Sequence, residues 1–301
     1  MGVVSIIAAL LLEQWRPLAE RKNVAGALGA WAGWLEQSFN GGERRHGTVA
    51  WVVAVLPAAL AVAALHWLLG QLGFVFALLF NVAVLYLTLG FRQFSHHFTD
   101  IQLAVKSGDV ERSRELLEQW RGASGVVRSR EEVVRLAIEE ALLASHRHVF
   151  GVLLWYVLLP GPSGAVLYRL AAYFAARWKA LGPFGEFAQR AFYWLEWPAV
   201  RLTAAAFAVV GDFEDAVYCW RTQARAWADP NDGIVLAAGA GAMGVRLGMA
   251  ALEMDGMRPR PELGLGEPAD GPFLDSTVGL LWRALVLWVF VLLLVTLARL
   301  L

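Results

Sequence analysis

The last segment of the chain, Val278 to Leu301, is almost entirely apolar, and its only charged residues are Arg283 and Arg299. At about 1.5 Å per residue, an α-helix of this length can cross the hydrocarbon core of a bilayer. Because the two arginines lie near its ends, both guanidinium groups can reach the lipid–water interface. The segment is therefore predicted to be a transmembrane helix, and the chain a membrane protein.

The rest of the chain has the composition expected of a protein with several such helices. Hydrophobic residues make up 58% of the 301 residues and charged residues only 17%, with a mean hydropathy of +0.50, which is too apolar for an ordinary soluble domain. The formal net charge is zero, so no overall positive field favours nucleic acid as a partner. We predict an all-α, polytopic membrane protein with about four to six spans, and the lipid bilayer as its partner. No oligomeric state is predicted.

Hydropathy and charge divide the chain into six segments. We predict an N-terminal apolar and interfacial amphipathic segment, a transmembrane hairpin, a cytoplasmic helical segment, a region of broken and polar-containing membrane elements, a loop and a C-terminal transmembrane helix. Their residue ranges are, in that order, 1–47, 48–91, 92–148, 149–252, 253–277 and 278–301. An excess of arginine and lysine indicates the cytoplasmic location of the third segment. Within it, Asp109 is predicted to cap one helix, and Ser129 with Glu132 to form a capping box for the next.

Prolines and glycines interrupt the apolar stretch at 149–176: Pro160, Gly161, Pro162 and Gly164. A break at membrane depth is tolerated only where neighbouring protein or a water-filled cavity satisfies the freed backbone groups. We therefore predict either two half-helices or a re-entrant pair. A transporter-like cavity at this break is one functional alternative.

Gly239, Gly241 and Gly244 match the GxGxxG spelling of a dinucleotide-binding loop. That motif indicates dinucleotide binding only when it follows a buried strand in a βαβ unit, and the sequence shows no such pattern. Close helix packing through small residues is the favoured interpretation.

Histidines flank the polar segment at both ends, but no HExxH motif or cysteine partner accompanies them, so we predict no metal site there. They are His96, His97, His146 and His148. Solvated or capping histidines are expected instead. Cys219 is the only cysteine, which excludes an intramolecular disulfide.

Five residues are candidates for a ligand site. Glu196 and Arg201 lie in an apolar stretch, where an ionisable side chain indicates a functional site, unless both charges reach the interface. Asn231 and Asp232 belong to a turn before a glycine-rich element that we expect from Ile234 to Leu252. The N–H groups at the N-terminus of that element would favour an anion. Arg246 lies within that element. We predict that these five residues bind a ligand, and no residue is assigned as catalytic.

Four stretches of the C-terminal half carry a resemblance: Trp197 to Thr203, Asp229 to Gly233, Ala238 to Gly248 and Pro261 to Gly264. In residue identity, order and spacing these stretches resemble the CobD/CbiB family of cobalamin-biosynthesis membrane proteins. The order of apolar and polar segments in the N-terminal half is also similar to that family. The resemblance implies a multi-pass protein of the bacterial inner membrane.

The resemblance also implies a reaction. Proteins of this family join an aminopropanol phosphate, or a related amino alcohol, to the corrin side chain of cobyric acid. The product is an amide, so an active protein would be an adenosylcobinamide-phosphate synthase-like amide ligase that uses ATP and Mg²⁺. The implied ligands are a corrinoid and an amino-alcohol phosphate.

The chain departs from the family pattern at three places. The family's Gly-Arg-Asp-Thr motif is replaced here by Gly122 to Gly125, and its Asn-Thr-Leu-Asp motif by Ala172 to Ala175. The stretch from Glu139 to Gly151 begins with acidic residues but lacks the Glu, Asn or Asp that the family has later in it. These changes remove oxygen ligands that Mg²⁺ prefers. We therefore expect a diverged or inactive synthase. The alternative is an AmpE-like membrane regulator in β-lactamase induction and cell-wall signalling, with a similar topology.

Overall fold

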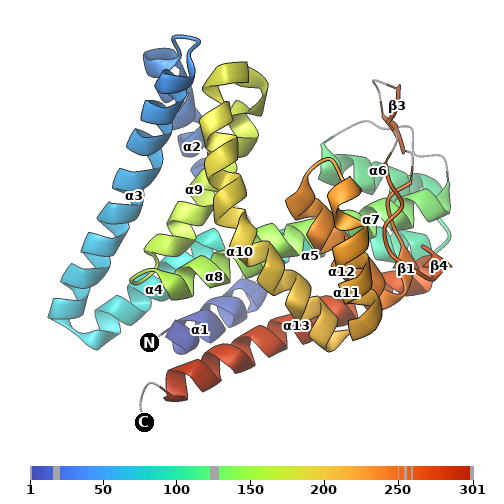
Figure 1. Cartoon of the computed structure of the whole chain (residues 1–301). Helices are drawn as coiled ribbons and strands as arrows, with labels where there is room; N and C mark the ends of the chain where they lie inside the picture. Colours follow the sequence, from blue (N-terminus) through green and yellow to red (C-terminus); the bar gives the residue numbers. More distant parts are fainter. Residues whose placement is uncertain are drawn as a thin grey trace. The chain divides into compact units, whose positions relative to one another are not determined.

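Helices dominate the computed structural model, and strands are few and short (Figure 1). The residues that the structure describes are 2–15, 21–122, 129–249, 251–253, 256–258 and 260–298. They form two compact units: unit 1 contains Met1–Gly90 and Arg147–Trp197, and unit 2 contains Phe91–His146 and Pro198–Leu301. The architecture confirms the prediction of an all-α helical membrane protein.

Unit 1 is a set of helices in which α3 packs against α4 and α9, and α1 packs against α4. Its elements are α1 (Gly2–Trp15), α2 (Arg21–Phe39), α3 (Arg44–Leu72), α4 (Phe74–Thr88), the π-helical turn η1 (His146–Phe150, shared at its first residue with unit 2), α8 (Gly151–Leu158), α9 (Ser163–Arg177), the 3-10 segment η2 (Trp178–Phe184) and the first part of α10 (Glu186–Val210). Only Gly73 separates α3 from α4, as expected for the predicted hairpin. The predicted break at Pro160 to Gly164 lies where α8 ends and α9 begins.

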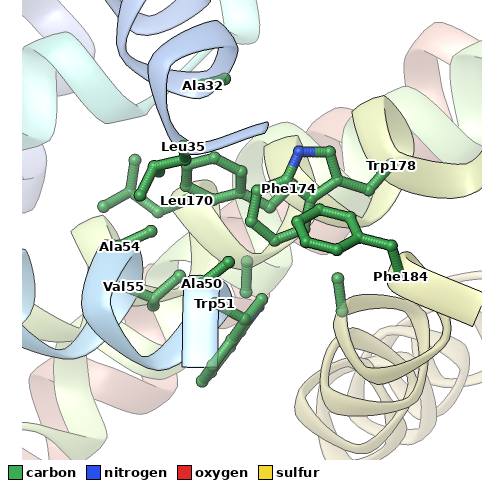
Figure 2. Packing of buried hydrophobic residues seen from close by; sticks show 12 residues of the cluster. Ala32, Leu35, Ala50, Trp51, Ala54, Val55, Leu170, Phe174, Trp178 and Phe184 are labelled. Carbon is green, nitrogen blue, oxygen red and sulfur yellow. The ribbon is translucent and has the colours of Figure 1, made fainter. Parts of the chain in front are cut away.

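Large aromatic side chains fill the core of unit 1 (Figure 2). Phe174 is fully buried, with its ring centroid 4.6 Å from that of Trp178 and 5.7 Å from that of Trp31. Trp178 in turn lies 4.9 Å from Phe184. Leu35 of α2 packs into the same cluster. The rings meet edge-on or tilted, the arrangement that aromatic quadrupoles favour.

Unit 2 surrounds α7 with α5, α6, α12 and α13. Its elements are α5 (Phe91–Lys106), α6 (Val110–Arg121), α7 (Arg130–Ser145), the rest of α10, α11 (Phe213–Thr222), η3 (Ala224–Ala226), α12 (Pro230–Met243), β1 (Val245–Arg246), β2 (Ala251–Glu253), β3 (Gly256–Arg258), β4 (Glu267–Pro268) and α13 (Gly271–Ala298). Strand β1 pairs in parallel with β4, and β2 pairs antiparallel with β3.

Two helices of unit 2 begin at the predicted caps. The Asp109 carboxylate accepts the backbone N–H of Arg112 at 3.0 Å. The Ser129 hydroxyl accepts the backbone N–H of Glu132 at 3.1 Å. Each side chain satisfies one of the N–H groups that a helix leaves unpaired at its start.

Small residues bring α12 close to its neighbours, and α11 and α12 lie side by side in Figure 1. A Cβ on Gly241 would lie 2.8 Å from the Ala216 Cα and closer still to the Asp215 carbonyl oxygen, and one on Gly239 would lie 2.8 Å from Leu142 Cδ1. Gly239 and Gly241 therefore serve helix packing, as predicted, whereas Gly244 has no atom within 4 Å of its Cβ position and caps the helix.

The glycine-rich element was expected from Ile234 to Leu252, and this expectation was wrong at both ends. Helix α12 begins at Pro230 because Asp229 caps it, and it ends at Met243 because Gly244 adopts a left-handed conformation with φ 66°. The chain beyond it forms short strands and turns.

Among the described residues, three helical runs are long and apolar enough to cross a membrane: Arg44–Leu72, Arg130–Leu158 and Gly271–Ala298. The first and third correspond to predicted spans, although the third begins at Gly271 instead of Val278, and Arg299 lies outside the described residues. The second run continues through η1 and crosses the segment boundary predicted at residue 148. Helices α1 and α4 are shorter apolar helices.

Candidate functional site

Glu139 of α7 is a buried carboxylate in unit 2, only 4% exposed. Its Oε1 accepts a hydrogen bond from the backbone N–H of Gly248 at 2.9 Å, and its Oε2 accepts one from Arg260 Nη2. Both oxygens thus have donors, which a buried carboxylate requires. Glu139 therefore ties a central helix to the chain that follows α12.

Arg260 is held in place by a second contact. Its guanidinium carbon lies 4.6 Å from the centre of the Trp227 ring, which is cation–π geometry. Trp227 in turn packs beside the first turn of α12, where a Cβ on Gly233 would lie 2.8 Å from Trp227 Cβ. A continuous chain of contacts therefore runs from Gly233 through Trp227 and Arg260 to Glu139.

Gln223 holds a further glycine turn of unit 2. Its Oε1 accepts the N–H of Gly264 at 2.6 Å, and its Nε2 donates to the Gly264 carbonyl at 3.4 Å. Gly264 has φ 91°, and a Cβ there would lie 2.7 Å from the Ala240 Cβ, so this close approach requires glycine. Three of the four stretches that carry the family resemblance thus pack together around α7 and α12.

Three of the five predicted site residues lie close to this cluster in the chain. Asn231, only 1% exposed, donates its N–H to the Asp229 side chain at 2.9 Å, and Asp232 belongs to the same first turn of α12. Arg246 of β1 donates from Nη1 to Glu262 Oε1 at 3.4 Å, and both side chains are partly exposed. Asn231 and Asp232 therefore lie in the same turn of α12 as Gly233, and Arg246 lies two residues before Gly248.

The other two predicted residues belong to different units. Arg201 lies on the part of α10 in unit 2, and Glu196 lies on the part in unit 1. Glu196 is 2% exposed, and its Oε1 accepts a hydrogen bond from Arg147 Nε at 3.2 Å. The structure therefore pairs the buried Glu196 carboxylate with the partly exposed Arg147 guanidinium on η1.

The π-helical turn gathers other polar groups in unit 1. The Nδ1 of His148 lies 3.2 Å from Arg169 Nη1, and the His148 carbonyl accepts the N–H of Gly90 at 3.2 Å. Single π-turns inside helices are frequent at functional sites. Two polar pairs therefore lie at the π-helical turn, Arg147 with Glu196 and His148 with Arg169.

Of the two expectations for the histidines, His146 meets the second: it is the C-cap residue of α7, where its backbone N–H donates to the Leu142 carbonyl. It is not solvated, since it is 1% exposed and its Nδ1 lies 3.0 Å from the Thr203 hydroxyl within unit 2. In the described part of the chain, no three histidine, cysteine, aspartate or glutamate side chains gather as metal ligands would.

Sequence reasoning missed several members of these clusters. Glu139 had a signal, since it stands among apolar residues of a helix, as Arg169 does. Gln223, Trp227 and Arg260 had none, because each contacts partners that only the fold brings near.

The Mg²⁺ that the family reaction is expected to use does not fit the Glu139 carboxylate. Both of its oxygens already accept N–H groups, and a guanidinium lies where a cation would bind. At Ala172 to Ala175, Phe174 and Ala175 are buried in α9. Of the stretch from Gly122 to Gly125, residues 123–125 lie outside the described residues. We derive no step through Mg²⁺ or ATP.

Comparison with known proteins identifies the family. The family described as CobD/Cbib protein matches residues 6–297. The cobalamin biosynthesis protein CobD of Stutzerimonas stutzeri (strain A1501) is 36% identical over 298 residues, which cover 96% of both chains. The protein of the same name from Chromobacterium violaceum is 36% identical over 242 residues, 78% of this chain and 76% of that one. No solved structure matches significantly. The chain therefore belongs to the CobD/CbiB family.

Proposed function

We propose that this membrane protein acts in cobalamin biosynthesis as the synthase that joins aminopropanol phosphate to cobyric acid through an amide bond. The observation that carries the proposal is the likeness over 96% of the chain to a relative named as a cobalamin biosynthesis protein. Family membership and the three apolar helical runs support a multi-pass location in the bacterial inner membrane.

The cluster around Glu139 supports a ligand site in unit 2. Amide formation develops negative charge on the carboxyl oxygen of the substrate, and N–H donors fixed beside that oxygen lower the barrier. Arg260 is a fixed donor of this kind, because Glu139 and Trp227 hold its guanidinium from two directions. The Asp229 to Gly233 turn and the glycine turns at Gly248 and Gly264 complete the surroundings.

The second candidate, a diverged or inactive synthase, rests only on the three departures in the sequence, and the cobalamin names of the relatives give it no support. At one of them, Ala172 to Ala175, the chain offers no side-chain carboxylate or amide. The relatives described above carry the cobalamin name, so they lend no support to the AmpE-like alternative.

Complementation of a bacterial strain that lacks this synthase tests the proposal. We expect the chain to restore corrinoid-dependent growth. We also expect membranes that contain it, supplied with ATP and Mg²⁺ to activate the carboxyl group, to form the amide product from cobyric acid and aminopropanol phosphate, detected by mass spectrometry. The Stutzerimonas stutzeri relative serves as the positive control. A protein that is inserted and abundant yet restores neither growth nor product would contradict the proposal and favour the inactive alternative.

Substitutions in the same assay test the site. Arg260→Ala removes the donor beside Glu139 and is expected to abolish growth, and Arg201→Ala and Asn231→Ala test the residues predicted from sequence. Arg112→Ala is the matched control, because Arg112 forms an exposed ion pair with Glu115 on α6. Equal growth of the Arg260 and Arg112 variants at equal abundance would place the site elsewhere.

A further inference from the structure

Two helices of unit 1 begin at the same end of that unit. Arg44, the first residue of α3, forms an ion pair with Glu186, the first residue of α10, in which Nε lies 2.8 Å from Oε2. In the same turn of α3, Gly47 packs against the end of η2, since a Cβ there would lie 3.1 Å from the Phe184 Cα. Both α3 and α10 therefore run away from this shared end (Figure 1).

An exposed apolar stripe begins one turn into α3. Its members share one face of the helix and are 37% to 67% exposed: Val49, Val52, Leu56 and Leu60. Because α3 is long and apolar enough to cross a membrane, this stripe is a surface for lipid tails. Arg45 is exposed and precedes Val49 by four residues, so it heads the stripe about 6 Å along the helix axis. Its guanidinium therefore lies at the level of the lipid headgroups.

The first part of α10 repeats this order of a cation followed by apolar surface. Arg190, Trp194 and Trp197 are spaced i, i+4 and i+7, and the two tryptophans are 62% and 41% exposed. Exposed tryptophans are typical of the membrane interface, where one side of the ring is apolar and the other wet. Arg190 is also exposed and follows Glu186 by one turn, so it lies beside the ion pair that joins α10 to α3.

Positive charge exceeds negative charge at this end. Within the described part of the chain, neither Arg45 nor Arg190 has a carboxylate partner, whereas the first residues of α3 and α10 neutralise each other. Lys179 of η2 is a further exposed cation, and Glu43, the residue before α3, is an exposed carboxylate. With histidine counted as neutral, these turns carry four cations and two carboxylates, so a surplus of two positive charges faces the headgroup level.

An anionic phospholipid fits this combination of surfaces. Its tails can lie along the apolar stripes while its phosphate oxygens accept hydrogen bonds from the guanidinium groups above them. A zwitterionic lipid offers the same phosphate but adds a cation, which the surplus positive charge repels. We propose that Arg45 and Arg190 bind the headgroups of anionic phospholipids where α3 and α10 begin.

Tryptophan fluorescence of the full-length protein in neutral detergent micelles measures this preference. The probes are phosphatidylglycerol and phosphatidylcholine with brominated tails, because bromine quenches nearby tryptophans and Trp194 lies one turn from Arg190. We expect phosphatidylglycerol to associate about fivefold to tenfold more strongly than phosphatidylcholine in about 0.1 M salt. In about 1 M salt the preference should fall to about twofold or less, because salt screens exposed charges. The measurement involves no substrate, so its result is independent of the proposed function.

Three double variants locate the preference. Arg45→Gln with Arg190→Gln removes both charges and should reduce the preference to about twofold or less. Arg45→Lys with Arg190→Lys keeps both charges and should retain most of it. The matched control, Arg112→Gln with Arg221→Gln, removes two exposed cations from unit 2 and should leave it unchanged. Because all four side chains are exposed, a Tm close to that of the unchanged protein shows that each variant is folded.

Three results would overturn the lipid site. Equal quenching of the unchanged protein by the two brominated lipids would show that it has no preference. An equal loss of preference in the two glutamine double variants would show that only the net charge of the protein matters. Displacement of brominated phosphatidylglycerol by inorganic phosphate, beyond the effect of chloride at matched ionic strength, would assign Arg45 and Arg190 to a soluble anion.

Discussion

Unit 1 and unit 2 fill their interiors by opposite means. In unit 1, the rings of Phe174, Trp178 and Phe184 occupy the space between helices. In unit 2, α11 and α12 lie so close together at Gly241 that there is no room for even a methyl group. Contact comes from side-chain volume in the first case and from its absence in the second. The same change of volume should therefore have opposite consequences in the two units.

The largest effect is expected from removal of volume in unit 1. Phe174→Ala leaves a cavity between Trp31 and Trp178, and the lost contacts should lower the free energy of unfolding by about 3–5 kcal/mol. Most of this loss comes from packing, because lipid tails are as apolar as the core. Thermal unfolding in detergent, followed by tryptophan fluorescence, measures it. A drop in Tm no larger than that of an exposed variant such as Leu60→Ala, on a side chain that is 67% exposed, would contradict this account of the core.

Addition of volume in unit 2 should have the next largest effect. Gly241→Ala places a methyl group against the backbone of Asp215 and Ala216, and backbone atoms have little freedom to move away. We expect a destabilisation of about 1–3 kcal/mol, measured as a fall in Tm.

The matched control is Gly279→Ala in α13, where a Cβ would meet no atom within 4 Å. Because alanine favours helix more than glycine does, this variant should be neutral or stabilised by up to about 1 kcal/mol. If both glycine variants behave alike, close approach does not explain the glycines of α12, and the comparison between the units fails.

The smallest effect should come from the thiol beside the same glycine contact. Cys219 of α11 is fully buried, and burial, with the nearby Asp215 carboxylate, raises the pKa of this thiol from 9.0 to about 11. The folded state therefore keeps its proton while the unfolded chain loses it. Stability from this group is present below pH 9 and is lost as pH rises from 9 towards 11.

Two measurements check the thiol. The fall of Tm between pH 9 and pH 10.5 should be slightly steeper in the unchanged protein than in Cys219→Ala. Alkylation of the thiol should be slow until the protein unfolds, because the reactive thiolate is both scarce and inaccessible. Rapid alkylation of the folded protein at pH 8 would mean that α11 and α12 pack less closely than the glycine contacts imply.

The sequence predicted the helical architecture well, because the signals for it are local. Long apolar runs, the Asp109 and Ser129 caps and the proline-glycine break all depend on neighbours in the chain, and the structure confirms each of them. The end of α12 was missed, because a left-handed glycine at Gly244 looks no different in sequence from the helical glycines before it.

The candidate site was predicted only in part. The sequence pointed to Asn231, Asp232 and Arg246 through a turn signal and a charge within an apolar element. It did not point to Glu139 as the partner of Arg260, since 121 residues of chain separate them and no local pattern relates the two. It grouped Glu196 with Arg201 as candidates in one apolar stretch, and it did not point to Arg147 on η1, which donates to Glu196.

The sequence by itself determined that this protein lies in a membrane and where its helices form, because hydropathy and helix capping act over a few residues. What only the tertiary structure decided is which polar groups meet. The pairing of Glu139 with Gly248 and Arg260 depends on the close approach of α7 to α12, which Gly239 permits. Contacts of this kind join residues far apart in the chain, so their geometry follows from packing and leaves no pattern in the sequence.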